Sequence, residues 1–170
     1  NTLRVVSNPI EILPTQIAKL KNLRVLVLHA NSLRELPNDS SLSNLTCLEE
    51  LSLNDNELTF LPNAISKLTN LRVLSACNNR LHTLPEMLST SLEILDLRVN
   101  RLVSIPEYVS KLCNLVTLRA GHNLIETLPE DMWDMSSLKR LELNNNHIAV
   151  FPDTIADIRS LRVLMLARNR

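Results

Sequence analysis

Histidine, cysteine and acidic side chains are the groups of this 170-residue chain that could perform catalysis or hold a metal ion. Cys77 could act as a nucleophile if His29 lay within hydrogen-bonding reach of its thiol. The sequence contains no H-E-x-x-H or C-x-x-C motif, and its single glycine, Gly121, cannot build a glycine-rich phosphate loop. We therefore expect no metal and no cofactor.

The composition argues against two classes of partner. Eighteen Lys and Arg residues balance eighteen Asp and Glu residues, so the formal net charge is zero. Proteins that bind nucleic acid or an anionic membrane by bulk charge need a marked excess of positive charge. No apolar run approaches the roughly 18 residues of a membrane-spanning helix. We predict no nucleic-acid binding and no membrane insertion.

The N-terminus and the cysteines bear on the cellular compartment. The first residues lack the charged and apolar regions of a secretory signal peptide. Cys47, Cys77 and Cys113 are an odd number of cysteines without close spacing, which is typical of free thiols in a reducing compartment. These features favour a cytoplasmic protein.

The elements that position these side chains follow from an asparagine that recurs at a nearly fixed period. Successive members of the series are separated by 23, 25, 23, 21, 23, 23 and 23 residues. The series consists of Asn8, Asn31, Asn56, Asn79, Asn100, Asn123, Asn146 and Asn169. A period of this length is typical of a solenoid, in which each repeat stacks on the next.

Leucines surround each asparagine in the frame L-x-x-L-x-L-x-x-N-x-L, and in seven repeats an apolar residue and a proline follow, as in Leu13-Pro14 and Leu61-Pro62. This frame resembles the leucine-rich repeat over the whole chain. The continuation L-P-x-x-I-x-x-L-x-N-L is similar to the 23-residue subgroup of intracellular Ras-binding scaffolds, LAP cell-polarity proteins and plant Ras-group-related proteins. The resemblance implies an α/β solenoid with a parallel sheet on its concave face and short helical, 3₁₀ or extended returns on its convex face.

We interpret residues 1–170 as a single domain of about eight repeats, of which the first and the last are incomplete. Each repeat supplies one short strand. In the strand around Leu26, Val27 and Leu28, the leucines point inward and Val27 points outward, because strand side chains alternate. The chain ends lack polar caps, which solenoids need, so we expect the domain to be a segment of a longer protein.

The recurrent asparagine has a structural role in this interpretation. Its side-chain amide carries two donor hydrogens and an acceptor oxygen, which can satisfy loop carbonyls and amides beyond the sheet. The proline removes a backbone donor where the chain leaves the strand, and the I-x-x-L spacing after it suits a 3₁₀ turn. Extra residues at 38–41 and a shortened stretch at 85–92 both fall on the convex returns.

The repeat spacing argues against catalysis. His29 and His122 lie four repeats apart, which is roughly 20 Å at the spacing of paired strands. Cys77 and His29 lie two repeats apart, or about 10 Å, which is beyond the reach of a hydrogen bond. We expect no enzymatic activity in this chain.

The outward strand positions form rows across the sheet, and these rows contain the candidate binding residues. Asp96, Arg119 and Glu142 occupy equivalent positions in consecutive repeats and so form a row of alternating charge. We predict a partner-binding site at Asp96, Arg98, Arg119, Arg140, Glu142 and Asn144. The alternative is that these charges only neutralise one another between strands.

The C-terminal half is expected to be basic on its concave face and acidic on its convex face. The convex acidic residues are Glu107, Glu130, Asp131, Asp134, Asp153 and Asp157. A basic concave surface steers acidic protein surfaces toward it. The family resemblance suggests a small GTPase or another signalling protein as the partner.

Trp133 and two glycosylation sequons are further features of the convex side. Trp133 has polar neighbours at Asp131 and Asp134, so we expect its ring to be partly exposed. Asn38 and Asn44 begin Asn-x-Ser/Thr sequons, which would carry glycans in a secreted protein.

The resemblance implies a protein–protein interaction scaffold that binds its partner on the concave face. Three alternatives remain at this stage. The chain could be the recognition or targeting segment of a larger signalling enzyme, such as a kinase, cyclase, phosphatase or ubiquitin ligase. It could instead belong to an extracellular receptor, or be an architectural element of a large assembly.

Overall fold

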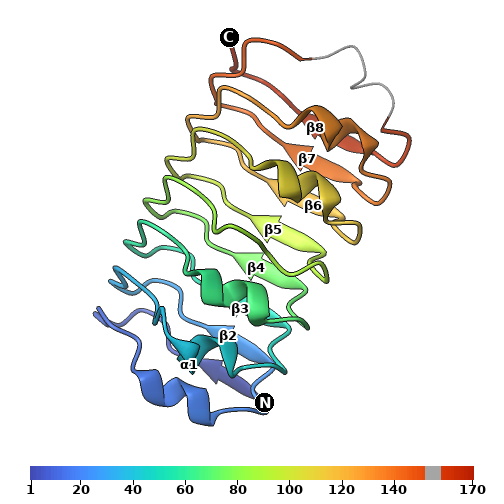
Figure 1. Ribbon diagram of the computed structural model, residues 1–170. Helices are drawn as coiled ribbons and strands as arrows, with labels where there is room; N and C mark the ends of the chain where they lie inside the picture. The colour runs from blue at the N-terminus through green and yellow to red at the C-terminus, as the bar shows by residue number, and fades with distance from the viewer. Residues whose placement is uncertain (152–157) are drawn as a thin grey trace.

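The computed structural model describes residues 1–151 and 158–170. One parallel sheet runs through the whole molecule, and its eight strands follow one another in sequence order, as Figure 1 shows. The strands are β1 (Thr2–Arg4), β2 (Val25–Val27), β3 (Glu50–Ser52), β4 (Val73–Ser75), β5 (Ile94–Asp96), β6 (Thr117–Arg119), β7 (Arg140–Glu142) and β8 (Val163–Met165). The predicted leucine-rich repeat solenoid is confirmed.

The register of the sheet follows the leucine frame without a slip. The middle residue of each strand is a leucine, and each pairs with the leucine of the next strand, as in Leu95↔Leu118 and Leu118↔Leu141. These three leucines are fully buried. The residue on either side of each leucine points outward, because the strand periodicity is two. We call the outer surface of this sheet the sheet face; it is the side that the sequence predicts to be concave.

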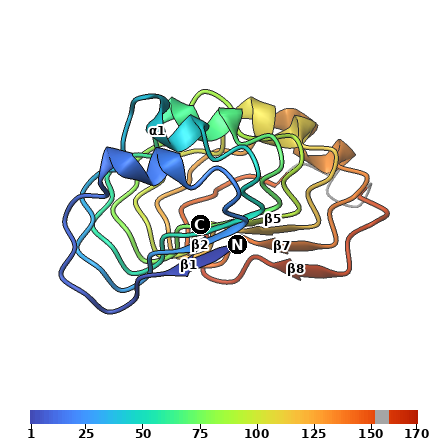
Figure 2. The same ribbon diagram turned by 90° about the horizontal axis from the view of Figure 1, so that it is seen from below.

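The return segments form a second layer on the opposite side, as the end-on view in Figure 2 shows. This layer contains the 3₁₀ helices η1 (Thr15–Lys19), η2 (Asn63–Lys67), η3 (Glu107–Lys111) and η4 (Glu130–Asp134) and the short helix α1 (Ser40–Ser43). A proline precedes every 3₁₀ helix, and Pro62 adopts an extended conformation with φ −68° and ψ 148°. The residue three positions after it, Ile65, is buried. The predicted 3₁₀ turns are therefore present; η1, η2 and η3 each anchor one side chain in the core, and η4 anchors two, Met132 and Trp133.

The two repeats of irregular length differ where the sequence places the difference. The longer repeat forms α1, whose first turn is capped by Asp39 Oδ1 accepting a hydrogen bond from Ser41 N at 2.8 Å. Hydrogen bonding by Ser41 also holds the pKa of the Asp39 carboxyl below its ordinary value. The shorter repeat passes through residues 85–92 without a helix. Both changes lie in the helical layer and leave the sheet register intact.

Trp133 corrects one expectation. Its side chain is only 2% exposed and belongs to the hydrophobic core, together with Met132 and Met135. The prediction of a partly exposed ring was wrong, because it was based on the polar neighbours in the sequence. Burial of the Trp133 ring depends on how the return segments of neighbouring repeats pack against one another. The polarity of residues adjacent in the sequence does not predict that packing.

Candidate functional site

The asparagine series bonds the loops that leave the strands, and Asn123 illustrates the geometry. Its Nδ2 donates to the carbonyl oxygens of Leu97 and Ala120, both at 3.0 Å, and more weakly to that of Gly121 at 3.4 Å. Its Oδ1 accepts a hydrogen bond from Leu102 N at 3.0 Å. A single buried amide thus joins its own loop to the preceding repeat.

The same arrangement recurs through the interior of the solenoid, at Asn56, Asn79, Asn100 and Asn146. The pattern weakens at the N-terminal end. Asn31 makes its donor bonds, but its Oδ1 is buried without a donor among the described residues. Asn8 is exposed and donates only to Val6 O. At the other end, Asn169 accepts from Ile148 N and donates to Leu143 O and Leu166 O.

The predicted row of charges on the sheet face is a connected network of ion pairs. Arg98 binds Asp96 with two nitrogens, Nε to Oδ1 at 2.9 Å and Nη2 to Oδ2 at 2.7 Å. Arg119 lies between the carboxylates of Asp96 and Glu142. Its Nη1 is 3.6 Å from Asp96 Oδ2, and its Nε is 3.4 Å from Glu142 Oε1. Arg140 Nε donates to Glu142 Oε1. Ion pairs therefore link five of the six predicted residues in one continuous series: Arg98, Asp96, Arg119, Glu142 and Arg140.

Burial divides this network into two levels. Asp96 and Glu142 are only 4% and 6% exposed, whereas the side chains of Arg98, Arg119 and Arg140 remain partly exposed. Three guanidinium groups therefore cover two buried carboxylates, and the network keeps one net positive charge. A partner approaching the sheet face meets arginine. The carboxylates of Asp96 and Glu142 are too buried to contact a partner directly. The sequence alone could not show this burial.

The bidentate pair with Asp96 favours the charged form of Arg98. The hydrogen bonds that the Arg98 guanidinium donates to Asp96 raise the pKa of Arg98 above its ordinary value, and the charge of Asp96 adds to this effect. Pairing of this kind also restrains the long arginine side chains, so less rotamer entropy is lost when a partner binds. We refer to Arg98, Arg119 and Arg140 as the arginine row.

Asn144, the sixth predicted residue, occupies space created by the only glycine of the chain. A Cβ atom added to Gly121 would lie 2.8 Å from Asn144 Oδ1 and 3.2 Å from the Asn144 carbonyl oxygen. Gly121 therefore lets the Asn144 side chain lie close over the backbone of the neighbouring strand. Gly121 was not among the predicted site residues. As the single glycine in 170 residues, it could have indicated a position where the backbone is closely approached.

A second charge alternation, along the entrances to strands β2 to β5, forms separate exposed pairs. Arg24 Nη1 lies 3.0 Å from Glu49 Oε1, and Arg72 Nη2 lies 2.7 Å from Glu93 Oε1. Exposed pairs of this kind contribute at most about 1 kcal/mol. They provide a useful comparison for the arginine row, because they have similar charges without a buried carboxylate.

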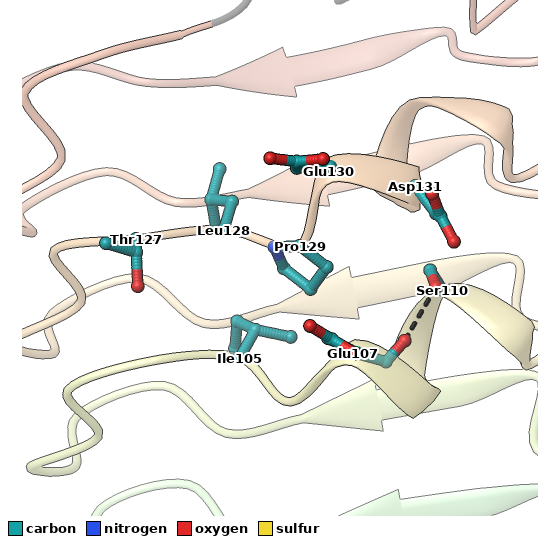
Figure 3. Close-up of a pocket in the computed structure, with 8 residues that line it drawn as sticks. All are labelled: Ile105, Glu107, Ser110, Thr127, Leu128, Pro129, Glu130 and Asp131. Carbon is teal, nitrogen blue, oxygen red and sulfur yellow. Dashed lines mark hydrogen bonds between the residues drawn. The ribbon is translucent and has the colours of Figure 1, made fainter.

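The helical side contains a hollow between η3 and η4, shown in Figure 3, with a volume of about 370 Å³. It is lined by Ile105, Glu107, Ser110, Thr127, Leu128, Pro129, Glu130 and Asp131. The Ser110 hydroxyl donates to the Glu107 carbonyl oxygen at 2.6 Å, so it is not activated by a base. Within the described ranges, no group of three or more His, Cys, Asp or Glu side chains is arranged to hold a metal ion.

The acidic side chains of the helical layer lie as the sequence predicts. Glu107, Glu130, Asp131 and Asp134 are exposed. Lys111 pairs with Asp131, and this hydrogen bond raises the pKa of the Lys111 ammonium group above its ordinary value. Asp153 and Asp157, the two remaining predicted members, lie outside the described residues.

The candidate nucleophile and bases do not come together. Cys77 is half-buried on the sheet face, and burial, aided by the charge of Asp96, raises the pKa of its thiol. His122 lies with its ring nitrogen 3.2 Å from Asn145 Nδ2. In the part of the chain that the structure describes, no histidine forms a hydrogen bond with a cysteine or a serine. Cys47, Cys77 and Cys113 are all free thiols.

Comparison with known proteins places this geometry in a family. The sequence matches the family described as "Leucine rich repeat" over residues 21–81 and 90–148. No curated protein sequence matches. A leucine-rich repeat protein of Leptospira interrogans has a similar structure, with 32% identity and a TM-score of 0.72 over 95% of this chain and 47% of that one.

Two further solved structures are similar. The leucine-rich repeat ectodomain of the plant membrane receptor kinase GASSHO1/SCHENGEN3 from Arabidopsis thaliana, in complex with CASPARIAN STRIP INTEGRITY FACTOR 2, is 30% identical, with a TM-score of 0.76. The match covers 98% of this chain and 22% of that one. An internalin from Listeria monocytogenes is 22% identical, with a TM-score of 0.78 over 92% of this chain and 44% of that one.

The chain spans less than half the length of each of these structures. Among the residues that the structure describes, no helix combines the length and the apolar character needed to cross a bilayer.

Proposed function

The chain belongs to the leucine-rich repeat family, and on that premise we propose that it is a protein-recognition module whose partner binds on the sheet face. Leucine-rich repeat domains generally mediate protein–protein interactions, and the Arabidopsis ectodomain named above was solved in complex with another protein factor. The proposal places the binding site of this chain at the arginine row and Asn144.

The observation that carries the proposal is the two-level network on the sheet face. Buried Asp96 and Glu142 hold three partly exposed arginine side chains in place, and each guanidinium group carries five N–H donors, more than its bonds to these carboxylates use. An acidic surface on a partner could accept these hydrogen bonds, and charge-assisted bonds between arginine and carboxylate are strong and directional. Because ion pairs with Asp96 and Glu142 already restrain the arginine side chains, binding would cost less conformational entropy.

We propose an acidic signalling protein as the partner, in a reducing compartment. The similarity of the repeat frame to the Ras-binding subgroup makes a small GTPase the first candidate, and the three unpaired thiols support a cytoplasmic location. A glycan attached to exposed Asn38 or Asn44 in protein isolated from its natural source would contradict that location.

A second candidate function is the recognition segment of a larger signalling enzyme. The similarity to the ectodomain of a receptor kinase, of which this chain spans 22%, favours it. In either case the chain itself would supply recognition and no catalytic group. The architectural alternative loses its support, because Trp133 is buried within its own core and offers no surface to another chain.

The ends of the arginine row provide the sharpest test. In the variant Arg98→Gln with Arg140→Gln, Arg119 still lies between the two buried carboxylates. Because the variant removes the closest partners of Asp96 and Glu142, urea unfolding first establishes that it is folded under the conditions of the binding assay. The substitution Arg119→Glu is unsuitable for this test, because it would place a third carboxylate beside the buried carboxylates of Asp96 and Glu142. The matched control is Arg24→Gln with Arg72→Gln, which removes two exposed arginines from similar ion pairs.

The partner is first captured from an extract with the unmodified chain, identified by mass spectrometry and purified. We expect its dissociation constant to rise at least tenfold for the arginine-row variant and less than twofold for the control. Equal affinities for both variants, with circular dichroism unchanged, would refute the proposed site.

A further inference from the structure

Among residues 1–151 and 158–170, eight residues, one in each repeat, have positive φ angles, and none of them is glycine. They immediately precede the recurrent asparagine and comprise Ser7, Ala30, Asp55, Asn78, Val99, His122, Asn145 and Arg168. The left-handed region is tolerated best by Gly, Asn and Asp, and a β-branched residue there is strained. Val99, with φ 54°, is the β-branched member of the series. Its backbone is therefore the most strained of the eight.

Val99 also exposes an apolar side chain, and two further apolar residues are exposed close to it. Val99, Val103 and Leu124 are 43%, 55% and 43% exposed. Residues 99, 101 and 103 point outward from the loop after β5, while Asn100 and Leu102 between them are buried. We call Val99, Val103 and Leu124 the loop patch.

Backbone hydrogen bonds join the loop patch across two adjacent repeats. Leu124 N donates to Leu102 O at 2.9 Å, which places Leu124 beside the segment between Val99 and Val103. Val99 N donates to Gly121 O at 3.0 Å, which places Val99 beside the glycine under Asn144. The patch is thus continuous with the sheet face.

Positive charge borders this patch. Arg98 of the arginine row directly precedes Val99, and Arg101 lies between Val99 and Val103 on the same exposed side of the loop. Arg101 forms no ion pair within the described part of the chain. Glu126 is the neighbouring exposed carboxylate, since its backbone N donates to Val103 O. Arg101 and Glu126 balance each other, so the excess positive charge beside the apolar side chains comes from the arginine row, whose network with Asp96 and Glu142 keeps one net positive charge.

We propose that the loop patch docks an aliphatic or aromatic side chain of an acidic peptide segment whose carboxylates bind Arg98 and Arg101. The exposed apolar side chain of Val99 disfavours the free chain, and burial against an apolar partner residue removes that cost. The positive φ of Val99 recurs at the equivalent residue of every repeat, so the repeat frame holds this backbone conformation whether or not a partner is bound. The inference rests on the proposed function and narrows its partner to an acidic segment with an apolar anchor.

The test uses a phage-displayed library of random 12-residue peptides selected on the unmodified chain. The selected peptides should be rich in Asp and Glu and should contain at least one Leu, Ile or Phe. Selection of basic peptides, of uncharged peptides, or of no enriched sequence at all would overturn the inference. The best peptide is then synthesised with a fluorescent label for measurement by anisotropy.

Three variants separate the inference from the proposed function. Val103→Ser with Leu124→Ser should raise the peptide dissociation constant at least tenfold, whereas the control Ile12→Ser with Met87→Ser, which alters two other exposed apolar residues, should change it less than twofold. If Arg98→Gln with Arg140→Gln weakens binding and the patch variant does not, the proposed function stands and the loop patch fails. If the patch variant alone weakens binding, the proposed function fails at the arginine row, and the assignment of a peptide carboxylate to Arg98 fails with it.

Val99 itself supplies an independent test, because its β-branched side chain destabilises the positive-φ backbone but is proposed to contact the peptide. Val99→Asn relieves the strain, so it should raise the thermal unfolding midpoint while weakening peptide binding at least threefold. Ala30→Asn makes a similar exchange at φ 55° in another repeat and should leave peptide binding unchanged. Unchanged or tighter peptide binding by Val99→Asn would contradict the assignment.

Discussion

Replacement of Asn123 by alanine should destabilise the protein by about 3–4 kcal/mol. The side-chain amide forms three bonds of normal length, from Leu102 N and to the carbonyl oxygens of Leu97 and Ala120, and a longer one to Gly121 O. A protein hydrogen bond contributes about 1 kcal/mol net, and a buried group left without a partner costs about 1–3 kcal/mol. Asn123 and its partners Leu97, Leu102 and Ala120 are buried, so water cannot easily replace the lost bonds.

The measurement is equilibrium unfolding in urea, followed by circular dichroism and by the fluorescence of Trp133, the only tryptophan. Amide hydrogen exchange adds a local probe, since Leu102 N loses its acceptor in the variant. The matched control is Asn8→Ala. Asn8 belongs to the same series, but it is exposed and forms one hydrogen bond, so its loss should cost less than about 1 kcal/mol.

A destabilisation by Asn123→Ala no larger than that by Asn8→Ala would refute the structural role of the asparagine series. Asn123→Asp gives a second check at nearly constant volume. Aspartate keeps the acceptor for Leu102 N but turns a carboxylate oxygen toward the carbonyls of Leu97 and Ala120. It should therefore destabilise at neutral pH at least as much as alanine does.

Three further predictions concern single side chains. Tyr108, the only tyrosine, is partly buried and donates to Pro85 O at 2.8 Å, and burial raises its pKa; its phenolate absorbance should appear only as the protein unfolds in alkali, and ionisation in the folded state near the ordinary value of about 10 would contradict this. Cys77 should react with iodoacetamide more slowly than exposed Cys47 and Cys113, because its raised pKa leaves less thiolate at neutral pH, and mass spectrometry of early time points would show a contrary order. Trp133 should show blue-shifted emission that acrylamide quenches only weakly until urea unfolds the chain.

Much of the fold could be predicted from periodicity alone. The inward leucines recur with the strand spacing, and each strand pairs with its neighbour in the register that the leucine frame defines. The proline after each apolar residue predicts the 3₁₀ turns, of which the one at Pro62 is typical. These inferences succeed because a repeat contacts chiefly its two neighbours, so local sequence determines most of the contacts that it makes.

From the sequence, the candidate site could be predicted only as rows of outward-facing strand positions in consecutive repeats. The outward positions placed Asp96, Arg119 and Glu142 beside one another, and the strand register agrees. Sequence spacing could not show that the two carboxylates are buried beneath the arginines. Nor could it show that Asn144 fills the space above Gly121, because both facts depend on the side-chain conformations that packing selects.

The sequence by itself thus determined the solenoid, the strand register, the role of the recurrent asparagine as a hydrogen-bonding residue and the sheet face as the place where charges meet. The tertiary structure alone decided that Trp133 is buried, that the sheet face presents arginine, and that Val99 is both strained and exposed. The physical reason is the range of the interactions involved. Alternation along a strand and repeat spacing are local properties, whereas burial and side-chain pairing depend on atoms contributed by neighbouring repeats more than 20 residues away in the chain.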